Sequence, residues 1–148
     1  MSRAITLALL LTMLGVGIEA AFACSCLTPT IKEARHRADG VFLGTIKTVT
    51  FLEPLNPGSR VAVEFEVSRV WKGPVTKQFE MRSLVETTLC EGFFRNDLVV
   101  GKQLLVFANR VLDGLRFSYS TNICTRTGPP ERYGKSLQLL GEGRLPDD

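Results

Sequence analysis

The segment Arg60-Val61-Ala62-Val63-Glu64-Phe65-Glu66-Val67-Ser68-Arg69-Val70-Trp71 decides the fold class. Its apolar side chains alternate with small or polar ones, so one face would collect Val61, Val63, Phe65 and Val67. Alternation with a period of two is typical of a strand that buries only one face. The segment therefore predicts a half-buried antiparallel strand, with Glu64 and Glu66 on the solvent side.

Further strands are predicted on both sides of this segment. Residues 41–51 are rich in β-branched and aromatic residues, and Gly44 in their middle predicts a bulge or a sharp bend. After a turn at Lys72-Gly73-Pro74, residues 75–85 return as a partner strand. Residues 103–110 and 115–121 form a second hairpin around Asp113-Gly114. Five strands with a bend in the first favour a mainly β fold, a small closed barrel of the oligonucleotide/oligosaccharide-binding (OB) type.

Two short helices are expected to flank this sheet. Residues 28–37 predict a helix that begins at Thr28 or Thr30, with Pro29 and Glu33 in its first turn. Residues 131–140 predict a C-terminal helix that packs on the sheet and ends at Gly141. Its apolar positions at helical spacing are Tyr133, Leu137 and Leu140.

The first 23 residues predict a cleaved secretory signal. Arg3 supplies the positive end, residues 5–18 are apolar, and Ala21-Phe22-Ala23 places small residues where signal peptidase inspects them. A membrane anchor is the alternative, but the apolar run is short for a bilayer span and ends at Glu19. We therefore expect an exported protein, extracellular or periplasmic, with no membrane span.

A lipoprotein leader is a second alternative, because a cysteine follows the predicted cut. Such leaders usually carry an aliphatic residue three positions before that cysteine, where this chain has Ala21, and Phe22 is bulky. Lipidation would consume both the thiol and the amine of Cys24. Cleavage without lipidation leaves residues 24–148 as one domain whose net charge is still +3, because one base and one acid are removed. A charge this mild, without a clustered stripe, argues against a nucleic-acid partner.

All four cysteines lie in the predicted mature part. An even number in an exported chain predicts two disulfides, and zinc binding is disfavoured because paired short-range ligand spacing is missing. A Cys24–Cys26 bridge is geometrically poor. The two remaining pairings both tie the N-terminal cysteines to Cys90 and Cys124, and the residues alone do not choose between them. The alternative interpretation of either pairing is that the bridges only staple a small secreted domain.

The order of these residues resembles the N-terminal domain of the tissue inhibitors of metalloproteinases, within the netrin-module (NTR) group. The resemblance rests on Cys24-Ser25-Cys26 after the leader, a short helix, and Ala38-Asp39 before Val41-Phe42. It continues through residues 87–94, 104–108 and Ile123-Cys124. It spans the mature chain, with sparse motifs, and implies a five-stranded barrel with bridges Cys24–Cys90 and Cys26–Cys124. The vertebrate inhibitors have a third bridge in this domain, which this chain lacks because His36 occupies the position of the helix cysteine. Their C-terminal subdomain is also missing, so the chain looks like a minimal single-domain relative.

The resemblance implies a secreted inhibitor of metalloendopeptidases that is not itself an enzyme. The α-amine and carbonyl oxygen of Cys24 would chelate the catalytic zinc of a partner proteinase and displace the water that the zinc activates. Ser25 would point into the specificity pocket of that proteinase. The flanking contact ridge would comprise Cys26, Leu27, Thr28, Pro29, Thr87, Thr88 and Leu89. No cofactor is expected, the protein would be a monomer, and the alternative is an NTR-type binding or structural module without inhibitory activity.

Other polar and aromatic residues give weaker functional indications. His36 is the only histidine, lies on an expected surface helix and lacks a convincing nucleophile partner, so no catalytic triad is predicted. Trp71 ends the alternating strand, where a packed rim position is the main interpretation and stacking on a sugar or base is the alternative. Lys32, Arg35 and Arg37 form a basic helix face of the kind that is usually solvated.

Overall fold

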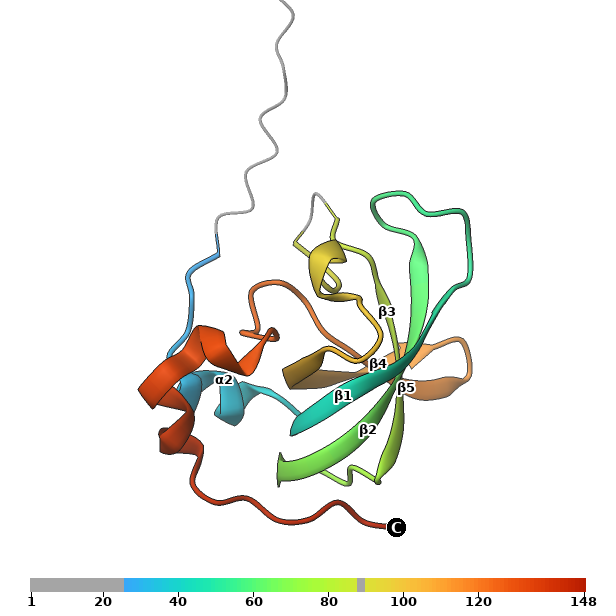
Figure 1. Cartoon of the computed structure of the whole chain (residues 1–148). Coiled ribbons are helices and arrows are strands. Elements are labelled where there is room, and N and C mark those ends of the chain that lie inside the picture. Colours follow the sequence, from blue (N-terminus) through green and yellow to red (C-terminus); the bar gives the residue numbers. More distant parts are fainter. Residues whose placement is uncertain (1–25, 88–89) are drawn as a thin grey trace, which may run out of the picture.

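The computed structural model describes residues 26–87 and 90–148, which form one antiparallel five-stranded sheet that curls strongly, flanked by short helices (Figure 1). The strand order is β3-β2-β1-β4-β5. The strands are β1 (Gly40–Phe51), β2 (Arg60–Lys72), β3 (Gln78–Leu84), β4 (Gln103–Asp113) and β5 (Arg116–Ser120). The helices are α2 (Ile31–Arg37), η1 (Arg95–Asp97) and η2 (Pro130–Leu140). The mainly β class with five strands is therefore confirmed.

The predicted bend in the first strand is present at Gly44. The pairing register of β1 with β2 shifts between Leu43 and Gly44. A Cβ at Gly44 would lie 3.1 Å from the Cβ of Phe65 and 3.2 Å from the ring of Phe42. Because the neighbouring strand and an aromatic ring approach so closely, a glycine at this position lets the strand curl over the core.

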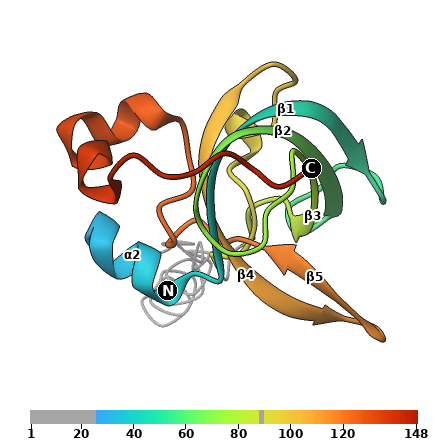
Figure 2. The ribbon, with the colours of Figure 1, turned by 90° about the horizontal axis from the view of Figure 1, so that it is seen from below.

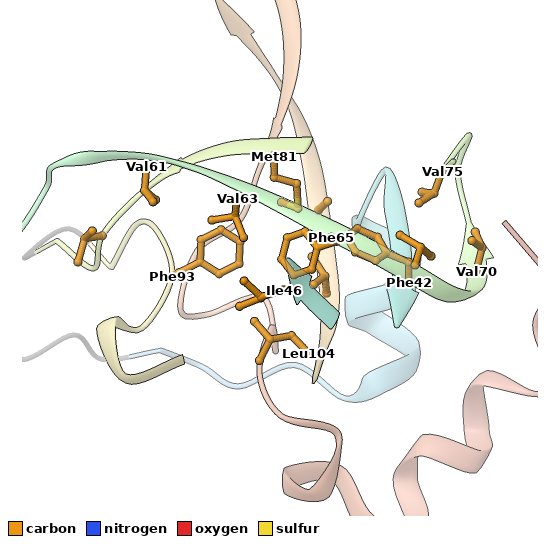
Figure 3. Close-up of a cluster of buried hydrophobic side chains, with 14 residues drawn as sticks. Phe42, Ile46, Val61, Val63, Phe65, Val70, Val75, Met81, Phe93 and Leu104 are labelled. Atoms are coloured by element: carbon orange, nitrogen blue, oxygen red, sulfur yellow. The ribbon is translucent and has the colours of Figure 1, made fainter. Parts of the chain in front are cut away.

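The concave face of the sheet holds the main core (Figure 3). The inward residues of β2 are buried, with an exposed fraction of at most 3%, as the alternation predicts: Val61, Val63, Phe65 and Val67. Phe42 packs edge-on against Phe65, with ring centroids 5.4 Å apart. This cluster anchors the curled half of the barrel.

A second core lies between the outer side of β1 and β4 and the flanking helices. It contains Val41, Leu105 and Phe107 from the strands, Ile31 and Ala34 from α2, and Tyr133 and Leu140 from η2. These two strands are therefore buried on both faces near their helix-covered ends. The arrangement fixes both helices beside the sheet (Figure 2).

The two outer strands, β3 and β5, approach each other through side chains. The hydroxyl oxygens of Ser83 and Ser120 are 2.9 Å apart, and the rings of Phe79 and Tyr119 have centroids 5.1 Å apart. Among the described residues no main-chain ladder joins these two strands. The observed architecture is thus a curled half-barrel.

The N-terminal helix follows the second of its two predicted starts. Thr30 is the N-cap: its hydroxyl accepts a hydrogen bond from the Glu33 amide, and the Glu33 carboxylate accepts one from the Thr30 amide. This reciprocal arrangement satisfies two amides that the first turn would otherwise leave unpaired.

Two predicted elements need correction. The C-terminal helix is a 3-10 helix that starts at Pro130 and is interrupted at Gly134, whose φ is 47° and ψ is −130°. The strand predicted over residues 75–85 covers only Gln78–Leu84, because Thr76 pairs in an isolated bridge with Asp147 of the C-terminal tail. In the described part of the chain, no helix is both long enough and apolar enough to cross a bilayer.

Candidate functional site

The N-terminal segment that precedes α2 is attached to the β5–η2 connection by a disulfide. Cys26 is bonded to Cys124, with their Cα atoms 5.3 Å apart and the two residues 98 positions apart in sequence. One of the two pairings expected from the resemblance is therefore present. Cys24, the predicted zinc-chelating residue, and Ser25 lie outside the described residues, so the partner bridge Cys24–Cys90 stays a prediction.

A second attachment holds the same segment three residues further along. The Arg126 guanidinium donates a 2.7 Å hydrogen bond from Nη1 to the carbonyl oxygen of Pro29. The guanidinium also stacks over the ring of Tyr133, 5.3 Å from its centroid. Tyr133 in turn donates its hydroxyl to the Arg126 carbonyl oxygen. Cys26 and Pro29 are thus both fixed to one loop, residues 121–126.

Burial affects the protonation of the Tyr133 phenol. Burial raises the pKa of Tyr133, and the nearby cations Arg132 and Arg126 oppose that effect. Because the phenol stays protonated well above neutrality, it acts as the donor toward the Arg126 carbonyl throughout the physiological range. Arg126 itself has a φ of 71°, an unusual left-handed conformation for a residue with a side chain. The hydrogen bonds around it hold that backbone in place.

The loop after β3 reaches the same end of the sheet. Cys90 donates its amide to the Thr87 carbonyl oxygen at 3.1 Å, and its own carbonyl accepts the Ile123 amide at 3.1 Å. The Thr87 hydroxyl accepts the Glu91 amide at 3.2 Å. Three segments far apart in sequence therefore meet at one end of the sheet: residues 26–29, Thr87 with residues 90–91, and the 121–126 loop.

The sulfur atoms of Cys26, Cys90 and Cys124 lie within 4.8 Å of one another. In the described ranges, 26–87 and 90–148, this is the only group of three or more cysteine, histidine or carboxylate side chains close enough to share a metal ion. Two of its sulfurs are already joined to each other, and none of the described cysteines is free. Metal ligation requires cysteine thiolates, so this arrangement of sulfur atoms indicates disulfide bonding and not a metal site.

The predicted contact residues differ in accessibility. Leu27 is 95% exposed, and Thr28 is exposed beside it. Pro29 is buried and lines a cavity of about 240 Å³ between the N-terminal segment, α2 and the 121–126 loop. Thr87 is half-buried, while Thr88 and Leu89 lie outside the described residues. Leu27 and Thr28 can touch a partner directly, and Pro29 acts as an anchor.

The remaining candidates occupy other places on the fold. His36 is exposed on α2. Trp71 is half-buried against the second core, and its indole Nε1 donates to the Gly141 carbonyl oxygen at 2.8 Å. The rim position predicted for Trp71 therefore holds. Glu64 and Glu66 are exposed on the outer face of β2, as the alternation predicts.

Sequence patterns gave no indication of Arg126, and they indicated Tyr133 only as an apolar position of the C-terminal helix, not as a partner of Arg126. Their importance depends on a contact between residue 29 and residue 126, which no local spacing encodes. A left-handed arginine in a loop leaves no pattern in one sequence. No protein-family model matches the chain, and no curated protein is significantly similar to it.

Proposed function

We propose that the chain is an exported, non-enzymatic inhibitor of zinc metalloproteinases. In this proposal the α-amine and the carbonyl oxygen of Cys24 bind the catalytic zinc of the partner. The observation that supports it most is the double attachment of residues 26–29, through Cys26–Cys124 and through Arg126 to Pro29. In this proposal, the attachments would hold a residue two positions before Cys26 close to the folded domain.

Zinc chelation requires three properties of the Cys24 α-amine. The amine must be free, which requires cleavage after Ala23 without lipidation. It must lose its proton on binding, and an α-amine with a pKa of about 7.7–8.0 does so at small cost near neutrality. It must also be held still, because ordering a flexible terminus at the moment of docking would reduce affinity.

Amine and carbonyl of one residue form a five-membered chelate with a metal ion. Occupying two positions on a catalytic zinc displaces the water that the metal activates for attack on the peptide bond. The proposed Cys24–Cys90 bridge would fix the chelating residue through its own sulfur. The Cys90 sulfur lies within 4.8 Å of the sulfurs of Cys26 and Cys124, and this proximity to the N-terminal segment supports the proposed bridge.

The contact surface around the chelate would be a narrow ridge. Leu27 and Thr28 form its exposed N-terminal part, and Ser25 would enter the specificity pocket. The 87–91 loop, with Thr87, Thr88 and Leu89, would supply the other side. Because a serine side chain fills a deep pocket poorly, we expect modest affinity.

The same proposal includes closure of the sheet into a five-stranded barrel of the OB type. It is supported by the approach of the two outer strands at Ser83 and Ser120 and at Phe79 and Tyr119. A closed barrel would leave fewer free edges and hold the three converging loops more rigidly.

Two forms of the mature protein test this function. One begins at Cys24, and the other carries one extra alanine before it. Each is assayed against a panel of zinc endopeptidases, and thermal unfolding is compared as a control of the fold. We expect inhibition by the first form only, with equal unfolding temperatures. Equal activity or equal inactivity of the two forms would exclude zinc chelation.

A second candidate, an NTR-type extracellular binding or structural module, has one observation in its favour. The hairpin formed by β4 and β5 exposes large apolar side chains at its tip, with Leu112 and Phe117 each 67% exposed and Leu115 fully so. Such a tip suits contact with another protein. A module of this kind would bind its partner equally with and without the alanine extension.

A further inference from the structure

The hairpin of β4 and β5 extends beyond the rest of the sheet as a two-stranded ribbon (Figure 1). The pairing of β1 with β4 ends at Ala108, so residues 109–113 of β4 pair only with β5. Among the described residues, β5 in turn pairs only with β4. A two-stranded ribbon has little stability of its own, and further packing against it is favourable.

Exposed apolar side chains gather on this hairpin and on the neighbouring end of the β1–β2 hairpin. The described residues leave twelve large apolar side chains exposed, and seven of them lie on these two hairpins: Phe51, Leu52, Leu55, Val111, Leu112, Leu115 and Phe117. The two groups are neighbours, because Leu52 and Leu112 line the same cavity. A patch of this kind on a protein surface marks a contact site.

Leu115 is the most prominent side chain of the patch. It lies in the two-residue turn between Asp113 and Arg116, which pair across the hairpin, and it is fully exposed. Turns of this kind usually carry glycine, asparagine, aspartate or serine, so the geometry of the turn does not call for a leucine. The side chain is therefore available as a knob for another surface.

A cavity of about 200 Å³ lies beside this knob, between the β4–β5 hairpin, β3 and the end of β1. Part of its lining is apolar and comes from these three places: Leu52, Leu84, Val111 and Leu112. Ser118 also lines it, and the Ser118 hydroxyl oxygen is buried without a hydrogen-bond partner in the described structure. The cavity thus has room for an aliphatic side chain and an unsatisfied polar atom beside it.

The charges around the knob and the cavity are complementary. Asp113 lines the cavity, and Arg116 directly follows the knob. Neither forms an ion pair with any described residue. Two further cations of the lining, Arg60 and Arg82, are already paired with Glu53 and Glu80. An arginine that approaches the cavity therefore finds one unpaired carboxylate.

We infer that the β4–β5 hairpin binds the same hairpin of a second copy of this chain. Knob and cavity belong to one patch, so a two-fold axis through the patch would place Leu115 of each copy in the cavity of the other. The same rotation would bring Arg116 of one copy to Asp113 of the other. The inserted turn would also bring main-chain groups to the unpaired Ser118 hydroxyl.

This dimer differs from the monomer that the family resemblance implies. It does not rest on the proposed inhibition, because none of the residues 26–29, 90–91 and 121–126 lines the cavity. It gives the apolar tip one specific protein partner.

A lipid bilayer is the rival occupant for an apolar hairpin tip. Asp113 lies two residues before Leu115, so its carboxylate would enter the apolar layer together with the leucine, which is unfavourable. In the dimer the same carboxylate meets a guanidinium. The position of Asp113 therefore favours a second copy over a bilayer.

Sedimentation equilibrium of the exported protein at about 0.15 M ionic strength tests the inference. We expect the mass to rise with concentration from that of one chain toward that of two. Leu115→Ser should weaken the association at least about tenfold, because one leucine side chain leaves the cavity of each copy. The matched control is Leu145→Ser, which should associate like the parent, since Leu145 is 77% exposed on the C-terminal tail and does not line this cavity.

Charge reversal tests the reciprocal arrangement of the two copies. Asp113→Lys and Arg116→Glu should each associate at least about tenfold less tightly alone, because like charges then meet across the two-fold axis. An equimolar mixture of these two variants should associate like the parent, since each reversed charge then meets an opposite one. Thermal unfolding of each variant serves as the control of the fold.

Three results would overturn the inference. They are a single-chain mass of the parent at every concentration, equal association of Leu115→Ser and Leu145→Ser, and a mixture of the charge variants that associates no better than each alone. Vesicles of phosphatidylcholine and phosphatidylglycerol test the rival occupant. A single-chain mass in solution, together with vesicle binding that Leu115→Ser abolishes, would assign the tip to a bilayer instead.

Discussion

Replacing Arg126 by methionine should loosen the N-terminal segment, because this side chain ties Pro29 to the 121–126 loop. A hydrogen bond from a charged donor contributes about 1.5–3 kcal/mol. The cation–π contact with Tyr133 adds about 0.5–2 kcal/mol. Against these stands the Nε atom of Arg126, which is buried without a hydrogen-bond partner in the described structure and costs about 1–3 kcal/mol. Methionine keeps the aliphatic packing and removes that cost.

The balance predicts a net loss of about 1–2 kcal/mol in the free energy of unfolding. For a domain of this size the loss corresponds to a fall of roughly 3–10 °C in Tm. Urea unfolding of the parent and of Arg126→Met measures the change. Arg110→Met is the matched control, since the Arg110 guanidinium stacks only on the exposed ring of Phe117. A difference below about 0.5 kcal/mol between Arg126→Met and the parent would refute the anchoring role.

Three further predictions concern the same framework. Replacing Cys26 and Cys124 together by serine should lower the free energy of unfolding by about 2–5 kcal/mol in a denaturant titration, because the bridge closes a loop of 98 residues; a smaller change would mean that the bridge constrains little. Gly92→Ala should lower the free energy of unfolding by at least about 2 kcal/mol, since φ is 92° and a Cβ would lie 2.1 Å from the Leu84 carbonyl oxygen. The control Gly114→Ala, which has open space around its Cβ, should lower it by about 1 kcal/mol or less. Because burial raises the pKa of Tyr133 in the folded protein, its contribution is complete below the ordinary phenol pKa and is lost as pH rises through the higher folded value. The Tm advantage of the parent over Tyr133→Phe should therefore shrink above about pH 10, and a constant advantage would contradict this assignment.

The strands were predictable from the sequence where one face is buried and the other is exposed to solvent. The β2 sequence alternates because Val61, Val63 and Phe65 enter the core while Glu64 and Glu66 stay in solvent. The bend at Gly44 was predictable because a glycine within a strand-like segment indicates close approach of another chain segment. The N-cap at Thr30 follows from its side chain and from Glu33 three residues later.

Elements that depend on distant partners were predicted less well. The C-terminal segment has apolar residues at helical spacing, yet Gly134 adopts a non-helical conformation and divides it into 3-10 turns. The start of β3 is displaced because Thr76 pairs with Asp147, 71 residues away. The burial of Tyr133 and Leu140 against the sheet agrees with this spacing, but the interruption at Gly134 is not encoded in it.

In the candidate site, too, local features were predictable and contacts between distant residues were not. The cysteines were evident, and the residues alone reduced their pairings to two, with the resemblance favouring Cys26–Cys124. The anchoring by Arg126 depends on residues 97 positions apart in sequence. Lys72 joins the basic face of α2 because β2 ends beside that helix, and a helical pattern cannot contain a strand residue.

Peptide mapping of the exported protein by mass spectrometry, without prior reduction, tests the central claim most directly. The account predicts a peptide whose first residue is Cys24, with an unmodified α-amine, joined by a disulfide to the peptide that contains Cys90. A separate linked pair should contain Cys26 and Cys124. An acylated Cys24, a chain that starts at another residue, or a Cys24 thiol without a bridge would contradict the account.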